Sequence, residues 1–372
     1  MYVIREAIPD DAPTLLKLAK MLHSNNLPAD LDIIRASIDR SIESFAGQYD
    51  DPAECHFMFV LEDMETGNMI GTSCIVGRVG LPHKPHLYLQ VRKREHYSND
   101  LQAGTVHVTV ELCQETNGMT EIGGLVLGPS YRGHKAKLGL LLSMIRFQFM
   151  AMNRKYFSDR LIAEMMGRLT PDSRNTLWEY LGRRFINLEY AEADRFCRHS
   201  KEFITSLFPK GEVYTSLLPA EARNLIGKVS PEAEGAKSML ESLGFKYKEH
   251  VDPFDGGPYL EAKLDDIQMI QTTKRAKLVS VTDHIATSGV EGFVSFVGET
   301  GYRAIRAFYS EVDGGVAIAK DEAELLAAQV GDELVVTPRP MSSAKGASET
   351  ARVLRVAKAD KRKRVGLRKA AS

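Results

Sequence analysis

A short apolar strand that runs into a basic, glycine-bearing turn is the part of this chain whose residue types best suit chemistry. Leu125–Leu127 predicts a buried strand, Arg132–Lys137 a cationic turn, and Leu138–Met152 an apolar helix. Such a turn points backbone N–H groups and a helix N-terminus at an anion. Its Arg and Lys side chains add charge-assisted hydrogen bonds to a phosphate. Many strand-to-helix turns carry glycine for backbone reasons alone, so the stretch by itself leaves a structural role open.

Composition places the chain among globular proteins. Its 372 residues suit about two or three domains. A net charge of -1 with 44% hydrophobic residues excludes a nucleic-acid coat and a disordered chain. The 4 cysteines lack CxxC spacing, so we expect neither a metal site nor a disulfide framework, and we expect a reducing cytoplasm. We expect neither a membrane-spanning segment nor a signal peptide, because the sequence contains no apolar run of spanning length and Met1–Arg5 lacks a basic-then-apolar pattern.

Periodicity and turn residues predict a mixed α/β region over residues 1–272. Pro9-Asp10-Asp11 starts a helix with an apolar face, and His56–Asp63 and Met69–Val76 form a hairpin. Segments 173–185 and 236–245 each read as a short helix, then Leu-Gly, then a strand, which suggests duplicated elements. The other expected elements are strand Tyr2–Arg5, helix Leu31–Phe45, strands Pro82–Val91, Thr105–Leu112 and Leu161–Met166, helix Asn175–Tyr180, and strands Lys246–Val251 and Tyr259–Lys263.

The pattern of residue types along the sequence changes after Thr272. Short strands separated by glycine-rich turns predict a small β-barrel-like domain over 277–340. Residues 341–372 are expected to be a linker and a disordered basic tail. The tail lacks interleaved aromatics and any nucleic-acid module, so we expect it to be solvated and to have no nucleic-acid partner. The strands expected in the small domain are Val279–Thr282, Gly292–Val297, Ala304–Phe308 and Glu333–Thr337.

Several motifs, in order along the chain, resemble one family. Ile4–Lys20 resembles the first strand and helix of the GCN5-related N-acetyltransferase fold, a mixed sheet flanked by helices. From the N-terminus to Asp265 the chain resembles the arginine N-succinyltransferases, which are acyl-CoA-dependent members of that superfamily. Past Thr272 the resemblance fades. The motifs that carry it are Phe59–Asp63, Leu125–Leu127 with Pro129 and Arg132, Leu141–Ser143 with Arg146-Phe147, Ala163–Met165, Trp178 with Leu181-Gly182, and Phe254–Pro258.

The resemblance implies succinyl-CoA as co-substrate, with no tightly bound cofactor, and L-arginine as the acceptor. This reaction opens a bacterial arginine-degradation route. The resemblance also implies a cytoplasmic enzyme without membrane contacts, in a homo-oligomer or a hetero-oligomer with a related subunit. On its motif positions, the acyl-CoA-binding residues are Leu125, Val126, Leu127, Arg132, Gly133, Lys137 and Gly139.

Two positions depart from the family pattern. The pyrophosphate turn is longer than the Arg-x-x-Gly-x-Gly rule, with Lys135 and Lys137 where glycine is expected. Either Gly139 supplies the last glycine or the lysines contact the phosphates. The family's proton-transfer His lies in Ile-Gly-x-Val-His-Pro, and here Ser230 stands in its place. A serine is no base near neutral pH without help, so the family mechanism does not transfer intact.

Proton transfer therefore has three candidates: Ser230, His250 and Glu164. Ser230 can position a water or protonate the leaving thiolate, and a helix cap is its ordinary role. His250 lies on a predicted strand near Asp252 and Asp255, where a structural hydrogen bond is the usual function. Glu164, at the end of the strand after the apolar helix, can act through a water or be a paired carboxylate.

Substrate recognition needs charges of both signs. A guanidinium takes a carboxylate partner, and Asp255, beside two glycines, is the candidate. A succinyl carboxylate takes a cation, and Arg146 is the candidate, with Arg168 and Arg184 as alternatives. The sequence thus predicts transfer of succinyl from succinyl-CoA to the α-amino group of L-arginine. It leaves open another acyl-CoA or amine, and a non-catalytic acyl-CoA-binding or regulatory subunit.

Overall fold

The computed structural model describes residues 1–21, 27–170, 174–197, 200–285 and 289–340. Met1–Pro338 form one compact unit. The predicted linker and basic tail, 341–372, and Ser173 of the suggested duplication lie outside the described residues. Within the described ranges, no helix is both long and apolar enough to cross a membrane.

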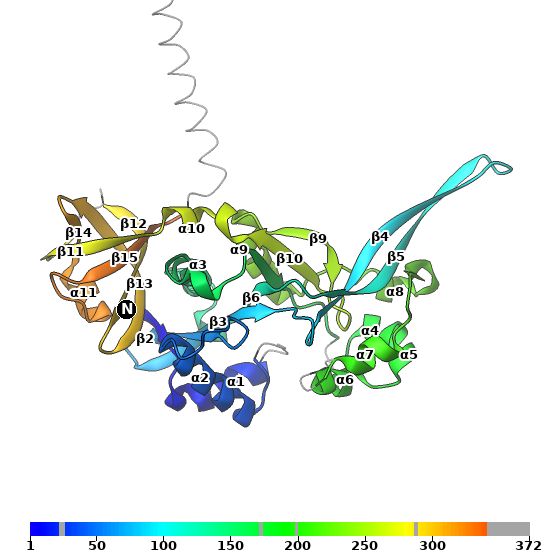
Figure 1. Ribbon diagram of the computed structural model, residues 1–372, viewed down its shortest axis with the longest axis horizontal. Coiled ribbons are helices and arrows are strands. Elements are labelled where there is room, and N and C mark those ends of the chain that lie inside the picture. The colour runs from blue at the N-terminus through cyan, green and yellow to red at the C-terminus, as the bar shows by residue number, and fades with distance from the viewer. Residues whose placement is uncertain (22–26, 171–173, 198–199, 286–288, 341–372) are drawn as a thin grey trace, which may run out of the picture. The chain divides into compact units, whose positions relative to one another are not determined.

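A mixed sheet forms the body of this unit (Figure 1). Its strands are β1 (Tyr2–Glu6), β2 (His56–Asp63), β3 (Asn68–Val79), β4 (His86–Ser98), β5 (Ala103–Glu115), β6 (Met119–Leu127), β7 (Arg160–Glu164), β8 (Val213–Tyr214), β9 (Lys246–Val251) and β10 (Pro258–Lys263). They follow the order β1-β2-β3-β6-β7-β10-β9-β4-β5-β8. The central neighbours β6 and β7 run parallel, whereas β3 and β6, and β7 and β10, are antiparallel. The predicted hairpin of β2 and β3 is confirmed.

Helices cover both faces of this sheet (Figure 1). Alternate residues of a strand point to opposite faces, so Phe57 and Phe59 of β2 pack against α3 (Leu138–Met152), while Met58 and Val60 pack against α1 (Ala12–Met21) and α2 (Leu31–Phe45). Helix α3 is apolar around most of its circumference and lies in the largest core cluster. The short helices α9 (Glu234–Ser242) and α10 (Gln268–Thr272) pack in the same cluster.

A group of short helices packs around Trp178. They are α4 (Thr176–Tyr180), α5 (Gly182–Ile186), α6 (Tyr190–Cys197), α7 (Glu202–Leu207) and α8 (Ala220–Arg223). We expected a strand after Leu181-Gly182, but α5 follows, whereas Gly244 is followed by strand β9 as expected. The helices bury their apolar faces around Trp178, which stacks on Phe254 at 4.8 Å between ring centroids, instead of extending the sheet.

The C-terminal strands close into a small barrel. They are β11 (Lys274–Thr282), β12 (Val290–Gly298), β13 (Gly301–Val312), β14 (Gly315–Ala319) and β15 (Glu333–Pro338), in the order β12-β15-β11-β14-β13, and β12 pairs with β13 to complete the circle. The mixed α/β class and the β-barrel-like C-terminal region are confirmed. Strand β14 and helix α11 (Lys320–Leu326) were not predicted. Because β13 also pairs with β1, the barrel continues the main sheet, and the domain boundary near residue 272 stays a prediction.

Candidate active site

Strands β6 and β7 separate soon after they meet. They pair at Thr120↔Leu161 and Glu121↔Ile162, and the described pairing ends there. Gly124 bends β6 at this point with a φ of +57°, and the register against β3 shifts beside it. A Cβ atom at Gly124 would lie 2.9 Å from the Sγ of Cys74, so both the backbone angle and the space favour glycine. The bend turns the edge of β6 away from β7.

A cavity of about 150 Å³ fills the gap between the two strands. Leu125 and Val126 form one wall, Ala163–Met166 form the second, and Ala236 and Leu240 of α9 close a third side. Leu127, the last of the three predicted strand residues, ends β6 opposite Gly71. Backbone N–H and C=O groups along an unpaired strand edge need partners. The wall therefore suits an extended ligand that carries amide groups.

Arg146 of α3 brings a buried cation to the same cavity. Its side chain is 2% exposed. Nη1 donates to the carbonyl of Gly123 at 3.2 Å, while Nε and Nη2 donate to the carbonyl and hydroxyl of Ser143 at 3.1 and 2.9 Å. Burial lowers the pKa of Arg146 to about 10, and no carboxylate of the described residues forms an ion pair with it. A buried cation without a counter-ion is costly, so the site is matched to an anionic group of a ligand.

The predicted anion turn precedes α3. Arg132 and Lys137 are exposed, and Arg132 Nε donates to the carbonyl of Leu127 at 3.2 Å. Gly133 and Lys137 both adopt left-handed backbone angles, with φ of +70° and +52°, and Lys137 immediately precedes the first turn of α3. A Cβ atom at Gly139 would meet nothing within 4 Å. Exposed cations, a helix N-terminus and open space are thus combined at one helix end.

We expect the Arg132→Ala and Lys137→Ala variants each to bind CoA about tenfold more weakly, because loss of about 1.4 kcal/mol of phosphate contact is a factor of ten. Calorimetric titration with CoA measures this. Lys93→Ala, which removes an exposed cation from β4, is the matched control. Equal CoA affinity in all three variants would show that the turn does not bind CoA.

Ser230 lies beside the cavity, in the segment between α8 and α9. Its backbone N–H donates to the carbonyl of Met166 at 2.8 Å, and Met166 lines the cavity. The side chain is buried, and its hydroxyl has no hydrogen-bond partner among the described residues. A buried hydroxyl without a partner is destabilising, which is tolerated where the group serves a ligand.

The Ser230→Ala variant distinguishes a structural role of the hydroxyl from a role in proton transfer. We expect the melting temperature to stay equal or to rise by up to a few degrees, because about 1 kcal/mol of desolvation cost is removed. Turnover should fall by up to about tenfold if the hydroxyl assists proton transfer. Thermal unfolding and steady-state rates are the two measurements. A large drop in stability would show that the hydroxyl is a structural group instead.

Glu164 ends β7, lines the cavity and contacts a histidine from β4. His86 Nδ1 lies 3.4 Å from Oε1 of Glu164, and the His86 ring packs on Tyr259, the cross-strand neighbour of Glu164. Burial first, and then the charge of Glu121, raise the pKa of Glu164 well above its usual range. Burial lowers the pKa of His86 to about 3. Burial thus disfavours the charged form of both groups, and pKa values shifted in this way are typical of proton-transfer sites.

Comparison with known proteins identifies the family. A family model described as "Arginine N-succinyltransferase beta subunit" matches residues 2–269. The chain belongs to the arginine N-succinyltransferase family. A curated relative from Shigella boydii serotype 18, named arginine N-succinyltransferase, is 36% identical over 286 residues, which are 76% of this chain and 81% of that one. The enzyme of the same name from Escherichia coli strain 55989 is 32% identical over 340 residues, 90% of this chain and 96% of that one.

A solved structure extends the similarity. Subunit AI of the arginine/ornithine succinyltransferase from Pseudomonas aeruginosa superimposes with a TM-score of 0.77 at 26% identity, over 91% of this chain and 98% of that one. The family and fold class predicted from the motifs are therefore confirmed, and the chain is an acyl-CoA-dependent N-acyltransferase. We expected the similarity to fade past Thr272, but this coverage shows that it continues into the barrel.

Two candidate residues, the proposed base His250 and the proposed guanidinium partner Asp255, are absent from the cavity lining. The ring nitrogens of His250 are 3.1 Å from Glu261 Oε1 and 3.0 Å from Gln90 Oε1, on strands beyond β7. The carboxylate of Asp255 accepts hydrogen bonds from the N–H groups of Gly167 and Gly257, both at 2.7 Å. Burial and the neighbouring Asp252 raise the pKa of Asp255. Both side chains are committed to hydrogen bonds that hold strands and turns in place.

His86 is the residue that sequence reasoning missed. It follows Pro85 at the start of β4, and nothing in its spacing connects it with Glu164. The contact requires β4, β9, β10 and β7 to be neighbours in that order. One feature of the sequence could have indicated His86. It is the first residue of an apolar strand, and the alternation of side chains along that strand predicts that His86 faces inward.

Proposed function

We propose that this enzyme transfers a succinyl group from succinyl-CoA to the α-amino group of L-arginine, the first step of arginine catabolism by the succinyl route. The supporting observation is Arg146, a buried cation without a carboxylate partner in the described residues, at the cavity between β6 and β7. A succinyl group ends in a carboxylate and an acetyl group does not, so a guanidinium there favours succinyl. The names of the matched relatives agree with this reaction.

The donor lies along β6 in this proposal. Its pantetheine amides pair with the free strand edge of Leu125–Leu127, and its pyrophosphate lies on the turn from Arg132 to Gly139. A backbone N–H of β6 at the bend donates to the thioester oxygen and stabilises the tetrahedral oxyanion. The succinyl carboxylate then accepts a hydrogen bond from Arg146, whose guanidinium is already held by the Gly123 carbonyl and Ser143.

The acceptor approaches the side of Glu164 on which carboxylates gather. Glu121, Asp252 and Asp255 lie close enough to Glu164 to raise its pKa. Like charges in a buried region disfavour ionisation, and burial together with neighbouring carboxylates raises the pKa of Glu164 and of Asp255. A guanidinium relieves this repulsion, so the region favours a cationic amino acid. Asp255 contributes charge in this account, although its oxygens already accept two backbone hydrogen bonds.

The reaction then needs one proton to be moved. The amine nitrogen attacks the thioester carbon, the C–N bond forms, and the C–S bond breaks when the tetrahedral intermediate collapses. Glu164, oriented by His86, takes the proton of the attacking amine. The leaving thiolate of CoA is protonated in turn, and Ser230 is placed to assist. His250 positions Glu261 and the adjoining strands in this account.

Release of free thiol tests the proposal. Purified protein is incubated with succinyl-CoA or acetyl-CoA and with L-arginine or other amines. The released thiol is quantified, and the mass of the product is measured by mass spectrometry. We expect release that requires both succinyl-CoA and L-arginine. Release with another pair would assign a related transferase. CoA binding without release for any pair would support a binding or regulatory subunit.

We further propose a cytoplasmic enzyme that needs no tightly bound cofactor and works as an oligomer, alone or with a related subunit. The described residues contain no group of three metal-binding side chains, and the proposed acyl transfer needs only acid–base and anion-binding groups. The relative of known structure is named as a subunit, which supports an assembly.

A further inference from the structure

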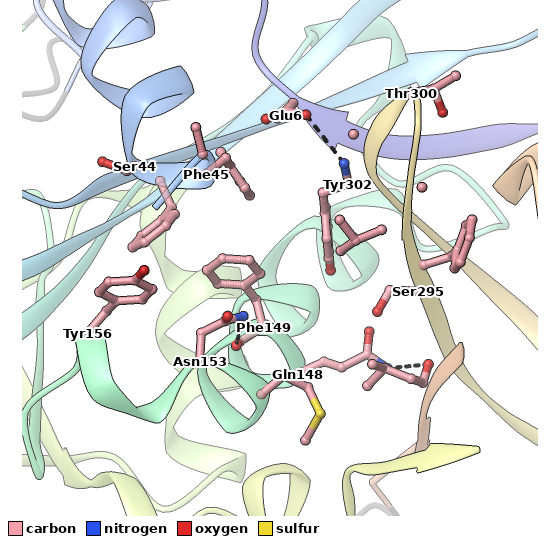
Figure 2. A pocket seen from close by; sticks show the side chains of 18 of the residues that line it. Glu6, Ser44, Phe45, Gln148, Phe149, Asn153, Tyr156, Ser295, Thr300 and Tyr302 are labelled. Atoms are coloured by element: carbon pink, nitrogen blue, oxygen red, sulfur yellow. Dashed lines mark hydrogen bonds between the residues drawn. The ribbon is translucent and has the colours of Figure 1, made fainter. Parts of the chain in front are cut away.

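A second and larger cavity, about 960 Å³ in volume, lies where the barrel meets the main sheet. Figure 2 shows side chains that line it. They come from the C-terminal end of α2, the C-terminal half of α3 and the segment that follows it, and the hairpin of β12 and β13. Volumes of about 300–1,000 Å³ are typical of small-molecule sites. The proposed acyl-transfer chemistry uses none of these side chains.

The floor of this cavity is aromatic. Phe45, Phe149 and Tyr302 contact one another pairwise, with ring centroids 5.3 to 6.0 Å apart, and Phe57 and Tyr156 continue the cluster. Figure 2 shows Phe45, Phe149 and Tyr302 grouped beneath Glu6. Aromatic faces carry partial negative charge, and they attract a cation whose centre lies within about 6 Å.

Two polar groups of the cavity, the partly buried Glu6 and the buried Gln148, are acceptors with spare capacity. Glu6 Oε1 accepts from the backbone N–H of Tyr302 at 3.3 Å, and this is the one hydrogen bond of its carboxylate within the described residues. Burial raises the pKa of Glu6, and the Tyr302 N–H and Arg5 oppose this only in part. A carboxylate in that state gains from an approaching cation.

Gln148 is the second group. It is fully buried, and its Nε2 donates to the carbonyls of Phe293 and Val335 at 2.9 and 3.3 Å. Two carbonyl acceptors fix which end of the amide carries the hydrogens. The Oε1 atom of Gln148 is left without a partner among the residues that the structure describes. An unpaired buried acceptor requires a donor to be satisfied.

The rim carries charges of both signs, with Lys155 and Arg275 as cations and Glu299 and Glu333 as anions. Lys155 is exposed, and its ammonium lies 4.6 Å from the centre of the Tyr156 ring. Arg275 lines the rim as well, in an ion pair with Glu333. A ligand with a cation at the floor and a carboxylate at the rim matches this distribution of charge.

We propose that this cavity binds a small molecule whose inner end is a guanidinium or ammonium group and whose outer end is a carboxylate. Free arginine is one member of this class. The N–H groups of the cation lie between the carboxylate of Glu6 and the Oε1 of Gln148, over the rings of Phe45 and Tyr302. The ligand carboxylate pairs with Lys155. This inference does not rest on the proposed acyl transfer.

Helix α3 connects this site with the acyl cavity. Arg146 lines the acyl cavity, and Gln148 and Phe149 line the larger one. Gln148 also donates to Thr337 Oγ1 of the barrel at 2.9 Å. A ligand that binds Gln148 therefore contacts α3, the helix that carries Arg146. Ligands at either site thus act on the position of the same helix.

Calorimetric titration of the full chain with 4-guanidinobutanoate tests the proposal. This compound has the cation and the carboxylate but no amine to be acylated, so it gives no acyl-transfer product. Because the region around Glu164 also favours a guanidinium, the Glu6→Gln variant and the crystal structure assign its binding to this cavity. 4-Ureidobutanoate is the neutral isostere. We expect the guanidino compound to bind and the ureido compound to bind at least about tenfold more weakly.

Two variants locate the binding. Glu6→Gln keeps an acceptor for the Tyr302 N–H but removes the charge, and we expect affinity for 4-guanidinobutanoate to fall about tenfold or more. Glu299→Gln removes an exposed carboxylate from the rim of the same cavity and should change affinity within about twofold. Acyl transfer under saturating substrates should be unchanged in both. Absence of binding to the wild type, or equal affinity in Glu6→Gln, overturns the proposal.

A crystal structure of the wild-type chain with 4-guanidinobutanoate gives an answer that does not depend on how the variants fold. The guanidinium is expected beside Glu6 and above Phe45. A compound bound elsewhere, with this cavity empty, overturns the proposal.

Discussion

The Arg146→Met variant is expected to lose most of its preference for succinyl-CoA over acetyl-CoA. Truncation of one partner of a buried charge pair costs about 2–5 kcal/mol, so kcat/KM for succinyl-CoA should fall about 10²–10³-fold. Acetyl-CoA has no distal carboxylate, and its kcat/KM should change by about tenfold or less. Steady-state kinetics with both donors at fixed L-arginine measure the change in ratio.

The fold should survive this change. In the free protein the Arg146 cation lacks a carboxylate partner among the described residues, and replacement of a buried charge by an apolar side chain is often neutral or stabilising. Arg184→Met, the same substitution at an exposed arginine of α5, is the matched control and should keep the donor preference. A parallel fall with both donors in Arg146→Met would mean that the arginine supports the helix rather than the succinyl group.

The Glu164→Gln variant is expected to lower kcat about 10²–10³-fold with little change in KM, because general base catalysis contributes about 10²–10⁴-fold. The wild-type rate should also depend on pH in a defined direction. Burial and Glu121 raise the pKa of Glu164, and a base works only in its deprotonated form. The rate of the wild type should therefore rise with pH through this raised pKa. In the variant this rise should be absent.

Glu232→Gln is the control for this experiment. Glu232 is an exposed carboxylate that lines the same cavity from the segment after Ser230, and its loss should leave both the rate and the pH profile close to those of the wild type. The account of Glu164 fails if both variants keep the wild-type profile. A rise in KM for L-arginine with kcat unchanged would contradict it as well, since that result would assign Glu164 to binding.

The main sheet was predictable because its strands carry local signals. His56–Asp63 and the strand that follows Gly67 alternate or run apolar around a turn, and the structure places them in register as β2 and β3. The barrel was predictable as a class but not in detail. Strand β14 runs into α11 with no Gly or Pro between Val316 and Leu326, so no local breaker marks where the strand ends and the helix begins.

The helices around Trp178 show where local resemblance misleads. Leu181-Gly182 and Leu243-Gly244 look alike in sequence, but Gly244 has a φ of +98° and ends its helix, whereas Gly182 begins α5. A Cβ atom at Gly182 would lie 2.2 Å from the Trp178 ring. Gly182 therefore permits close packing on the tryptophan, and this tertiary requirement is invisible in the pattern.

The candidate site was predictable in its backbone parts and less so in its side-chain pairs. Strand Leu125–Leu127, the basic turn and Arg146 follow one another along the chain, and the structure places Leu125, Val126 and Arg146 at one cavity. The pair of His86 and Glu164 joins strands far apart in the sequence. The larger cavity likewise needs Glu6, Phe45, Gln148 and Tyr302 to meet, and sequence periodicity carries no information on such contacts.

A crystal structure of the chain with succinyl-CoA, prepared without an acceptor amine, tests the central claim most directly. The account predicts that the thioester lies at the bend of β6, between β6 and β7, and that the succinyl carboxylate accepts a hydrogen bond from Arg146 at about 2.8 Å. A succinyl group that points into solvent, with Arg146 bound only to Gly123 and Ser143, would contradict it.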